Sequence, residues 1–200
     1  MWIFLMPGLH AQSQDSIFHI KKLSDTIIDL DRYWKYNPGD DSTWAALDYP
    51  DQDWDTVSPA LNMEDADEHQ FPGKAWFRLR FTVDSSVMNR SYILLMRHNG
   101  ASEVYHNGVF IKRNGTIREG EENDRNTDPV NMPISLYFGD KSEHVIAVRY
   151  ANENAQKFYD KYATEVAGFS MSIMDDTAMR QTLAGVSLGM GLIIFLTSIF

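Results

Sequence analysis

The chain has 200 residues, 44% of them hydrophobic and 12% aromatic, which suits one packed domain of ordinary size with appendages. Its formal net charge of −10 argues against a nucleic-acid-binding protein, because binding phosphate requires concentrated lysine and arginine. It contains no cysteine, which excludes a disulfide scaffold, a thiolate metal site and a lipid-anchored lipoprotein, whose attachment point is a cysteine.

The first residues have the pattern of a secretory signal peptide. Trp2 to Leu9 is a short apolar run, and Ala11 supplies a small residue before the expected cleavage point. No lysine or arginine precedes the run and Pro7 interrupts it, so a disordered or misassigned N-terminus is the alternative. We expect residues 1–11 to be the signal peptide and residues 12–175 to form an exported domain.

The segment after the signal peptide combines short strands with a long loop. Ser16 to Ile28 alternates enough to fit a first edge strand, and a second strand is expected around Trp34. An Asp-rich connection with Trp44 and Trp54 follows. Such a loop stays ordered only if its indoles are buried against the domain. We therefore predict that Trp34, Trp44 and Trp54 are packing anchors rather than ligand platforms, and that at least two of them belong to the core.

The stretch from Gly73 to Gly108 has the strongest strand signal in the chain. Its first run alternates with a period of two, as a half-buried strand requires. The predicted core face carries Phe77, Leu79, Phe81 and Val83, and the opposite face carries Trp76, Arg78 and Arg80. We expect Leu94, Val104 and Val148 of later strands to join this core. Asn107-Gly108 lies between two extended runs and predicts a type I′ hairpin, because both residues tolerate positive φ.

Three more strands and two acidic loops complete the expected domain. The strands are predicted at Pro133 to Phe138, His144 to Tyr150 and Val166 to Met174. The loops are Leu61 to Phe71 and Arg118 to Asp128, and neither has the ligand pattern of a dedicated calcium loop. Seven or eight strands at this spacing predict an all-β, antiparallel β-sandwich.

A final apolar run predicts one transmembrane α-helix over residues 182–200. Thr182 to Phe200 contains no charged residue, and as a helix it rises about 28 Å, enough to cross the hydrocarbon core. Gly185 and Gly189 form a small-xxx-small face suited to packing against another membrane helix. The alternative is a buried helix of a soluble protein, for which an all-β domain offers no interior. We expect this run to be the first span of a longer membrane protein.

The sequence carries no recognised catalytic motif. The histidines are scattered without HxxxH or HExxH spacing, and there is no GxSxG elbow, phosphate-binding loop or GxGxxG. We therefore expect no catalytic residue, no cofactor and no metal site in this chain.

Several spaced residues resemble those of a galactose-binding-like jelly roll. The pattern includes Trp34, Gly39-Asp40-Asp41, Trp44, Asp53-Trp54, Trp76-Phe77-Arg78, Val104-Tyr105, Asn107-Gly108 and the run from Val145 to Arg149. It covers roughly Tyr33 to Met174 and is similar to the sugar-binding N-terminal domain of family 2 glycoside hydrolases. That resemblance implies a jelly roll without catalytic residues.

The order of signal peptide, jelly roll and membrane helix resembles a bacterial seven-helix receptor with diverse intracellular signalling modules. The resemblance implies a ligand-sensing domain outside the bacterial cytoplasmic (inner) membrane, coupled to a cytoplasmic kinase, cyclase or phosphatase. Implied partners are a carbohydrate or small polar ligand, the membrane and further transmembrane helices, and a homodimer is compatible with this. Two alternatives stay open: the non-catalytic sugar-binding domain of a carbohydrate-active enzyme, and a binding protein with a single membrane anchor.

Strand alternation places the candidate ligand-binding residues on the polar faces of the predicted strands, and if these strands are neighbours in one sheet the residues combine into one patch. These residues are Arg78, Arg97, Glu103, Tyr105 and Arg149. Arginines offer bidentate donors to carboxylates or sugar hydroxyls, and a tyrosine ring can stack on a sugar. The competing interpretation, which we favour, is that these charges pair with one another on a solvated sheet face.

Overall fold

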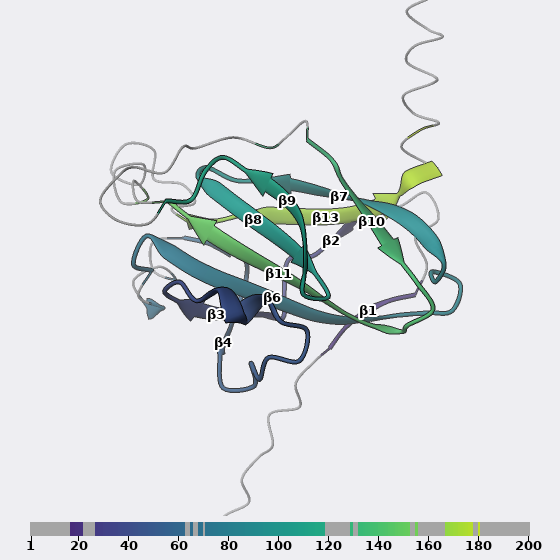
Figure 1. Ribbon diagram of the computed structural model, residues 1–200, viewed down its shortest axis with the longest axis horizontal. Helices are drawn as coiled ribbons and strands as arrows, with labels where there is room; N and C mark the ends of the chain where they lie inside the picture. Colours follow the sequence, from purple (N-terminus) through teal and green to yellow (C-terminus); the bar gives the residue numbers. More distant parts are fainter. Residues whose placement is uncertain are drawn as a thin grey trace, which may run out of the picture.

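The computed structural model describes residues 17–21, 27–62, 71–118, 132–152 and 167–177, together with the single positions 65, 68, 69, 129, 155 and 180. Over these residues the fold is a β-sandwich, and nearly all strand pairs are antiparallel, as predicted. One sheet lies over the other in Figure 1. The predicted signal peptide (1–11), the run from Thr182 to Phe200 and almost all of the acidic loop 118–128 lie outside the described residues.

The larger sheet, sheet A, has the strand order β4-β3-β6-β11-β8-β9, and β1 adds a short parallel pairing to the end of β6. Its strands are β1 (Phe18–Ile20), β3 (Trp34–Pro38), β4 (Asp55–Val57), β6 (Lys74–Val83), β8 (Ala101–His106), β9 (Val109–Asn114) and β11 (Glu143–Ala151). The first edge strand expected over Ser16 to Ile28 is instead divided: β1 joins sheet A, and the next strand joins the other sheet.

The smaller sheet, sheet B, has the order β10-β7-β13-β2. Its strands are β2 (Ile28–Asp29), β7 (Arg90–Arg97), β10 (Ile134–Phe138) and β13 (Ser170–Asp175). A separate two-stranded ladder joins β5 (Ala60–Leu61) to β12 (Ala167–Gly168) at one end of the sandwich. Among the described residues, no helix is long and apolar enough to cross a membrane.

The core between the sheets has the composition that the alternation predicts. The predicted core residues Phe77, Leu79, Phe81, Leu94, Val104 and Val148 are all buried in it. They meet because β11 pairs with both β6 and β8, which sets Val148 opposite Phe77 on one side and opposite Val104 on the other. Burying such large apolar side chains is the main favourable term in the stability of the domain.

The three tryptophans divide between two clusters. Trp34 is fully buried in the main core and donates its indole N–H to the Leu30 carbonyl, 2.8 Å away. Trp44 and Trp54 lie outside this core, which corrects the expectation that at least two of the three belong to it. They are half-buried, 5.3 Å apart, and cover a second cluster around Trp76 on the outer face of sheet A. All three are nevertheless packing residues, as predicted.

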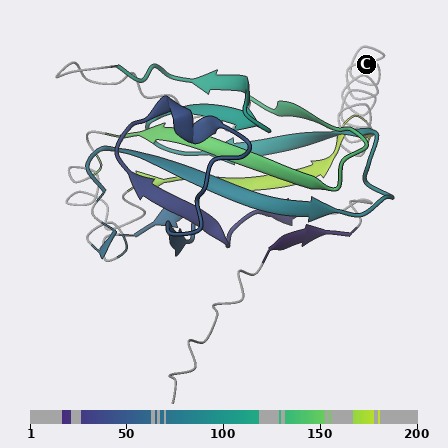
Figure 2. The same cartoon turned by 60° about the horizontal axis from the view of Figure 1, so that its bottom comes forward.

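The segment that carries Trp44 begins with a short 3-10 helix, η1 (Ser42–Ala45), capped by the Asp41 carboxylate. Figure 2 shows this segment crossing the outer side of β11 and β6. The Asn107-Gly108 turn at the end of β8 has φ values of 51° and 81°, as a type I′ hairpin requires. Gly108 also passes close to the loop, since a Cβ there would lie 3.3 Å from the Leu47 nitrogen.

Candidate functional site

Three of the predicted site residues meet on the outer face of sheet A. Arg149 of β11 lies directly opposite Glu103 of β8, and Tyr105 follows two residues along on the same face. Tyr105 donates to Glu103 Oε2 over 3.0 Å, and Arg149 Nη1 donates to the same oxygen over 3.2 Å. Arg113 of β9 donates to Glu103 Oε1 from two nitrogens, at 2.9 and 2.8 Å. We call this cluster, together with Asp40, the Glu103 network.

The Glu103 network satisfies its own charges. Arg149 also forms a bidentate pair with Asp40, with both N–O distances 2.6 Å, and this hydrogen bonding raises the Arg149 pKa. Burial alone would raise the pKa of Glu103, but hydrogen bonds from Arg149 and Tyr105 outweigh it and hold the pKa below its usual value. Both Glu103 oxygens accept from two donor groups, which leaves little capacity for a ligand. The network therefore joins β8, β9, β11 and the Asp40 turn, as the favoured interpretation predicts.

Arg78 is closed off from any ligand. Its side chain is fully buried, because the segment after η1 folds over the outer face of β6. Its Nε donates to Asp51 over 2.7 Å, and its Nη1 donates to the Trp44 carbonyl. Burial lowers the Arg78 pKa, and the pairing with Asp51 opposes this. Alternation correctly placed Arg78 on the outward face, but nothing in the pattern showed that the loop covers it.

Asp51 is a buried carboxylate that the sequence analysis did not identify. It is 1% exposed and also accepts from Arg80 Nε over 2.8 Å, so one carboxylate holds two guanidinium groups. Arg80 donates in addition to the Tyr49 carbonyl over 2.7 Å. These bonds fix the Asp-rich loop to β6, and the arrangement is therefore structural.

Arg97 lies in the other sheet, away from the Glu103 network. Its strand, β7, pairs with β10 and β13 and makes no ladder with β6, β8 or β11. The expectation that the five residues combine into one patch is therefore wrong for Arg97. On sheet B its side chain lies on the outer face, directly opposite Ser170 of β13.

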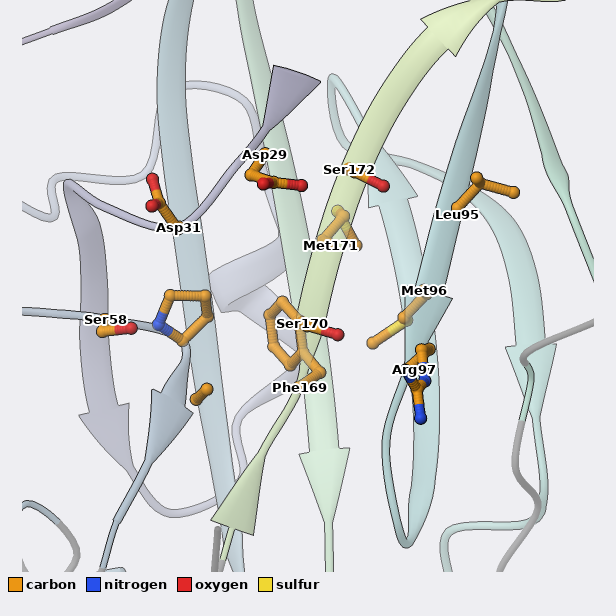
Figure 3. A pocket seen from close by; sticks show the side chains of 12 residues that line it. Asp29, Asp31, Ser58, Leu95, Met96, Arg97, Phe169, Ser170, Met171 and Ser172 are labelled. Atoms are coloured by element: carbon orange, nitrogen blue, oxygen red, sulfur yellow. The ribbon is translucent and has the colours of Figure 1, made fainter. Parts of the chain in front are cut away.

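Arg97 lines a cavity of about 390 Å³ on the outer side of sheet B, which we call the Arg97 cleft (Figure 3). Its polar lining consists of Asp29, Asp31, Ser58, Arg97, Ser170 and Ser172. Its apolar lining consists of Pro59, Ala60 and Leu95, together with Met96, Phe169 and Met171, which are buried in the main core beneath it. The volume lies within the range of small-molecule sites, and an apolar lining with a few convergent polar groups is typical of them.

The charged groups of the Arg97 cleft stand on opposite sides of it. β13 lies between β7 and β2, and its Ser172 pairs with Asp29 of β2, while its Ser170 pairs with Arg97 of β7. Arg97 and Asp29 are two strands apart in the sheet and offset by two residues along the strand direction. With the usual strand spacing and rise per residue, their Cα atoms are about 12 Å apart. Figure 3 shows the side chains of β13 between them.

Among the described residues, no neighbour neutralises Arg97 or Asp29. Within the described part of the chain, the side chains of Arg97 and Asp29 form no hydrogen bond and no ion pair. Asp31 makes one long contact with exposed Arg32, at 3.9 Å. The cleft therefore contrasts with the Glu103 network, since no described residue occupies the donors of Arg97 or the acceptors of Asp29.

Gly168 positions the floor of the cleft. It has a φ of +85°, and a Cβ at this residue would lie 1.9 Å from the Pro59 carbonyl oxygen. The absence of a side chain lets Phe169 donate its backbone N–H to that same oxygen over 2.9 Å. The β5–β12 ladder and the cleft floor therefore depend on glycine at this position.

A larger cavity of about 560 Å³ lies near the start of β11, and its lining includes Arg80, Lys141 and His144. Arg80 is already committed to Asp51 and to backbone carbonyls, as described above. His144 is buried and donates to the Lys141 carbonyl over 3.0 Å. We therefore regard the smaller Arg97 cleft as the candidate site.

No protein-family model matches the sequence, and no curated protein matches it. Among solved structures, a β-glucuronidase from glycoside hydrolase family 2 is 20% identical and covers 75% of this chain, with a TM-score of 0.48. A Bacteroides uniformis β-glucuronidase is 12% identical over 76% of the chain, also at 0.48, and a Bifidobacterium dentium β-glucuronidase is 15% identical over 79%, at 0.45. The chain spans only 18% of the first two structures and 31% of the third.

Proposed function

We propose that this chain contains a non-catalytic β-sandwich module that binds a carbohydrate or another small polar ligand in the Arg97 cleft. The observation that supports this is the pairing state of the charges. Arg97 and Asp29 line a cavity of ligand size and have no partner among the described residues. A polar ligand supplies the missing partners, and the apolar lining takes its non-polar surface.

The serine hydroxyls make the cleft suited to a ligand rich in hydroxyl groups. Ser170 and Ser172 lie on the same face of β13, between the guanidinium of Arg97 and the carboxylate of Asp29. A hydroxyl both donates and accepts, so it pairs with sugar hydroxyls in either orientation. The Glu103 network offers no comparable freedom, because its donors already have acceptors.

The wider role that we propose is ligand sensing outside the bacterial cytoplasmic membrane, coupled to a cytoplasmic effector. Support comes from the sequence: the pattern of residues 1–11 suits export, and the uncharged run from Thr182 to Phe200 follows the module. Protease added to intact spheroplasts that produce the chain should digest the β-sandwich. Complete protection would contradict an extracytoplasmic location.

Binding is tested by calorimetric titration of the 200-residue chain with a panel of monosaccharides and sugar acids. Arg97→Ala and Asp29→Ala should each weaken binding about tenfold or more, the value expected for loss of one charge-assisted hydrogen bond. Arg113→Ala is the matched control, because it removes an arginine from the Glu103 network and leaves the cleft intact. If both cleft variants bind as tightly as the wild type, the site lies elsewhere.

A further inference from the structure

We propose that the ligand of the Arg97 cleft is a monosaccharide acid, bound with its carboxylate on Arg97 and its hydroxyls toward Asp29 and the serines. The inference rests on the proposed binding function of the cleft and adds the chemical class of the ligand. It follows from the different requirements of the two sides of the cavity.

The β7 side of the cleft requires an acceptor. Arg97 is exposed on the outer face of sheet B and has no carboxylate partner among the described residues. A guanidinium matches a carboxylate with two parallel hydrogen bonds, whereas a neutral sugar hydroxyl accepts from one N–H at a time. The strongest unmet interaction on this side is therefore with a bidentate oxyanion such as a carboxylate.

The β2 side requires donors. Asp29 and Asp31 both line the cleft there, and ionised carboxylates can only accept. A simple anion such as acetate satisfies Arg97, but it has no hydrogen bond to offer these aspartates and is repelled by them. A ligand that satisfies both sides carries an acid group at one end and hydroxyls at the other.

The dimensions favour one sugar ring. About 12 Å separates the Cα atoms of Asp29 and Arg97 on the outer face of sheet B, and this spacing suits one ring with a hydrogen bond of about 3 Å at each end. The cavity volume of about 390 Å³ is small for a ligand site. Leu95 lies on the same face, opposite Ser172, and gives the non-polar side of a ring a surface to contact.

The test compares acids with their neutral parents. The 200-residue chain is titrated with glucuronate and galacturonate, with glucose and galactose as matched neutral sugars, and with acetate and alanine. We expect at least one acid to bind about tenfold or more tightly than its parent sugar, and more weakly as salt is raised. Acetate and alanine should bind more weakly than that acid.

The variants assign this preference to one side chain. Arg97→Ala should reduce the acid to the affinity of its parent sugar and leave the parent sugar within about twofold, because a neutral ligand lacks the charged contact. Arg97→Lys should keep part of the preference, since it keeps the charge but loses the bidentate geometry. Arg90→Ala, at the other end of the same strand, is the matched control and should bind like the wild type.

The outcomes separate this inference from the proposed function. If none of the titrated ligands binds, acetate and alanine included, the proposed function and the inference are both overturned. If sugars bind and the neutral parents bind as well as the acids, only the inference fails. It also fails if alanine binds better than every acid, because the donor on the Asp29 side is then an amine, or if Arg97→Ala leaves the acid preference intact.

Discussion

A pair of stacked histidines predicts that this domain loses stability in mild acid. His106 ends β8 and His144 lies at the start of β11, and their ring centroids are 5.1 Å apart. His144 is 3% exposed and is enclosed by Phe81 and Phe138, whose ring centroids are 5.5 and 4.6 Å away. A charge on this ring has almost no contact with water.

The hydrogen bonds around the pair fit a neutral His144 ring. The Lys141 carbonyl can only accept, so the proton of His144 is on Nε2 and its Nδ1 is an acceptor. Two donors face that Nδ1, from His106 Nε2 and from the Asn107 amide, each at 3.1 Å. A second proton on His144 would then face two donors. The same Asn107 side chain accepts from the Val145 backbone N–H over 2.9 Å, so the hairpin turn is docked on the pair.

The size and sign of the effect follow from the pKa values. Burial, with a smaller contribution from His144, lowers the pKa of His106 from its ordinary value of 6.5 to about 4. Burial also lowers the pKa of His144. Between pH 6.5 and pH 4 the unfolded chain binds more protons than the folded chain. The stability that the neutral His106 contributes is therefore complete above pH 6.5 and is lost as the pH falls toward 4. The difference between the ordinary and the native pKa of His106 corresponds to a loss of roughly 1–3 kcal/mol in the free energy of unfolding. This is less than the pKa difference alone would give, because the half-buried ring is partly screened by water.

Urea unfolding between pH 7.5 and pH 4.5 measures this loss. His106→Gln keeps a polar side chain without titrating, and should flatten the fall in unfolding free energy over this range. His19→Gln, which changes an exposed histidine, is the control and should retain the wild-type slope. Acidic side chains begin to titrate at the lower end of this range, but they do so in the wild type and in both variants, so the difference between the slopes reports the histidine. Identical slopes for wild type and His106→Gln would refute the reasoning.

Three further changes test the packing. Asp51→Ala leaves the buried Arg78 guanidinium without its carboxylate and should cost about 3–5 kcal/mol in urea unfolding, whereas a loss below about 1 kcal/mol would mean that water reaches the arginine. Gly168→Ala places a Cβ against the Pro59 carbonyl at positive φ and should cost about 1–3 kcal/mol; an unchanged thermal midpoint would contradict that close approach. Phe81→Ala removes a core ring and should cost about 3–5 kcal/mol by the same urea assay, and a near-neutral result would place that ring outside the core.

Local alternation predicted the faces of the strands but not what covers them. In β6 it correctly separated Phe77 and Phe81, which are in the core, from Arg78 on the outer face. It could not show that Arg78 is buried on that outer face, because the covering residue, Asp51, lies in a loop without periodicity. Loop position depends on tertiary contacts, and only the tryptophans of this segment gave a signal.

Sheet membership was the second limit. Alternation correctly placed Arg97 on the other face of its strand from Leu94 and Met96. The sheet to which that strand belongs is determined by long-range pairing of β7 with β10 and β13. The other side of the cleft had still less signal, since Asp29 lies in a strand of only two residues. The Glu103 network was easier to predict, because β8 and β11 are long strands whose direct pairing aligns Glu103 with Arg149.

The same two chemical groups, guanidinium and carboxylate, therefore have different roles in this domain according to their surroundings. A solvated pair contributes about 0–1 kcal/mol, so an exposed arginine such as Arg97 gains little from a carboxylate that merely touches it. It gains more when the ligand and the cleft floor together exclude water from the contact. That floor rests on the approach of Phe169 to Pro59, which Gly168 permits. Gly168→Ala should therefore weaken ligand binding even at temperatures where the chain remains folded, although this residue offers the ligand no side chain.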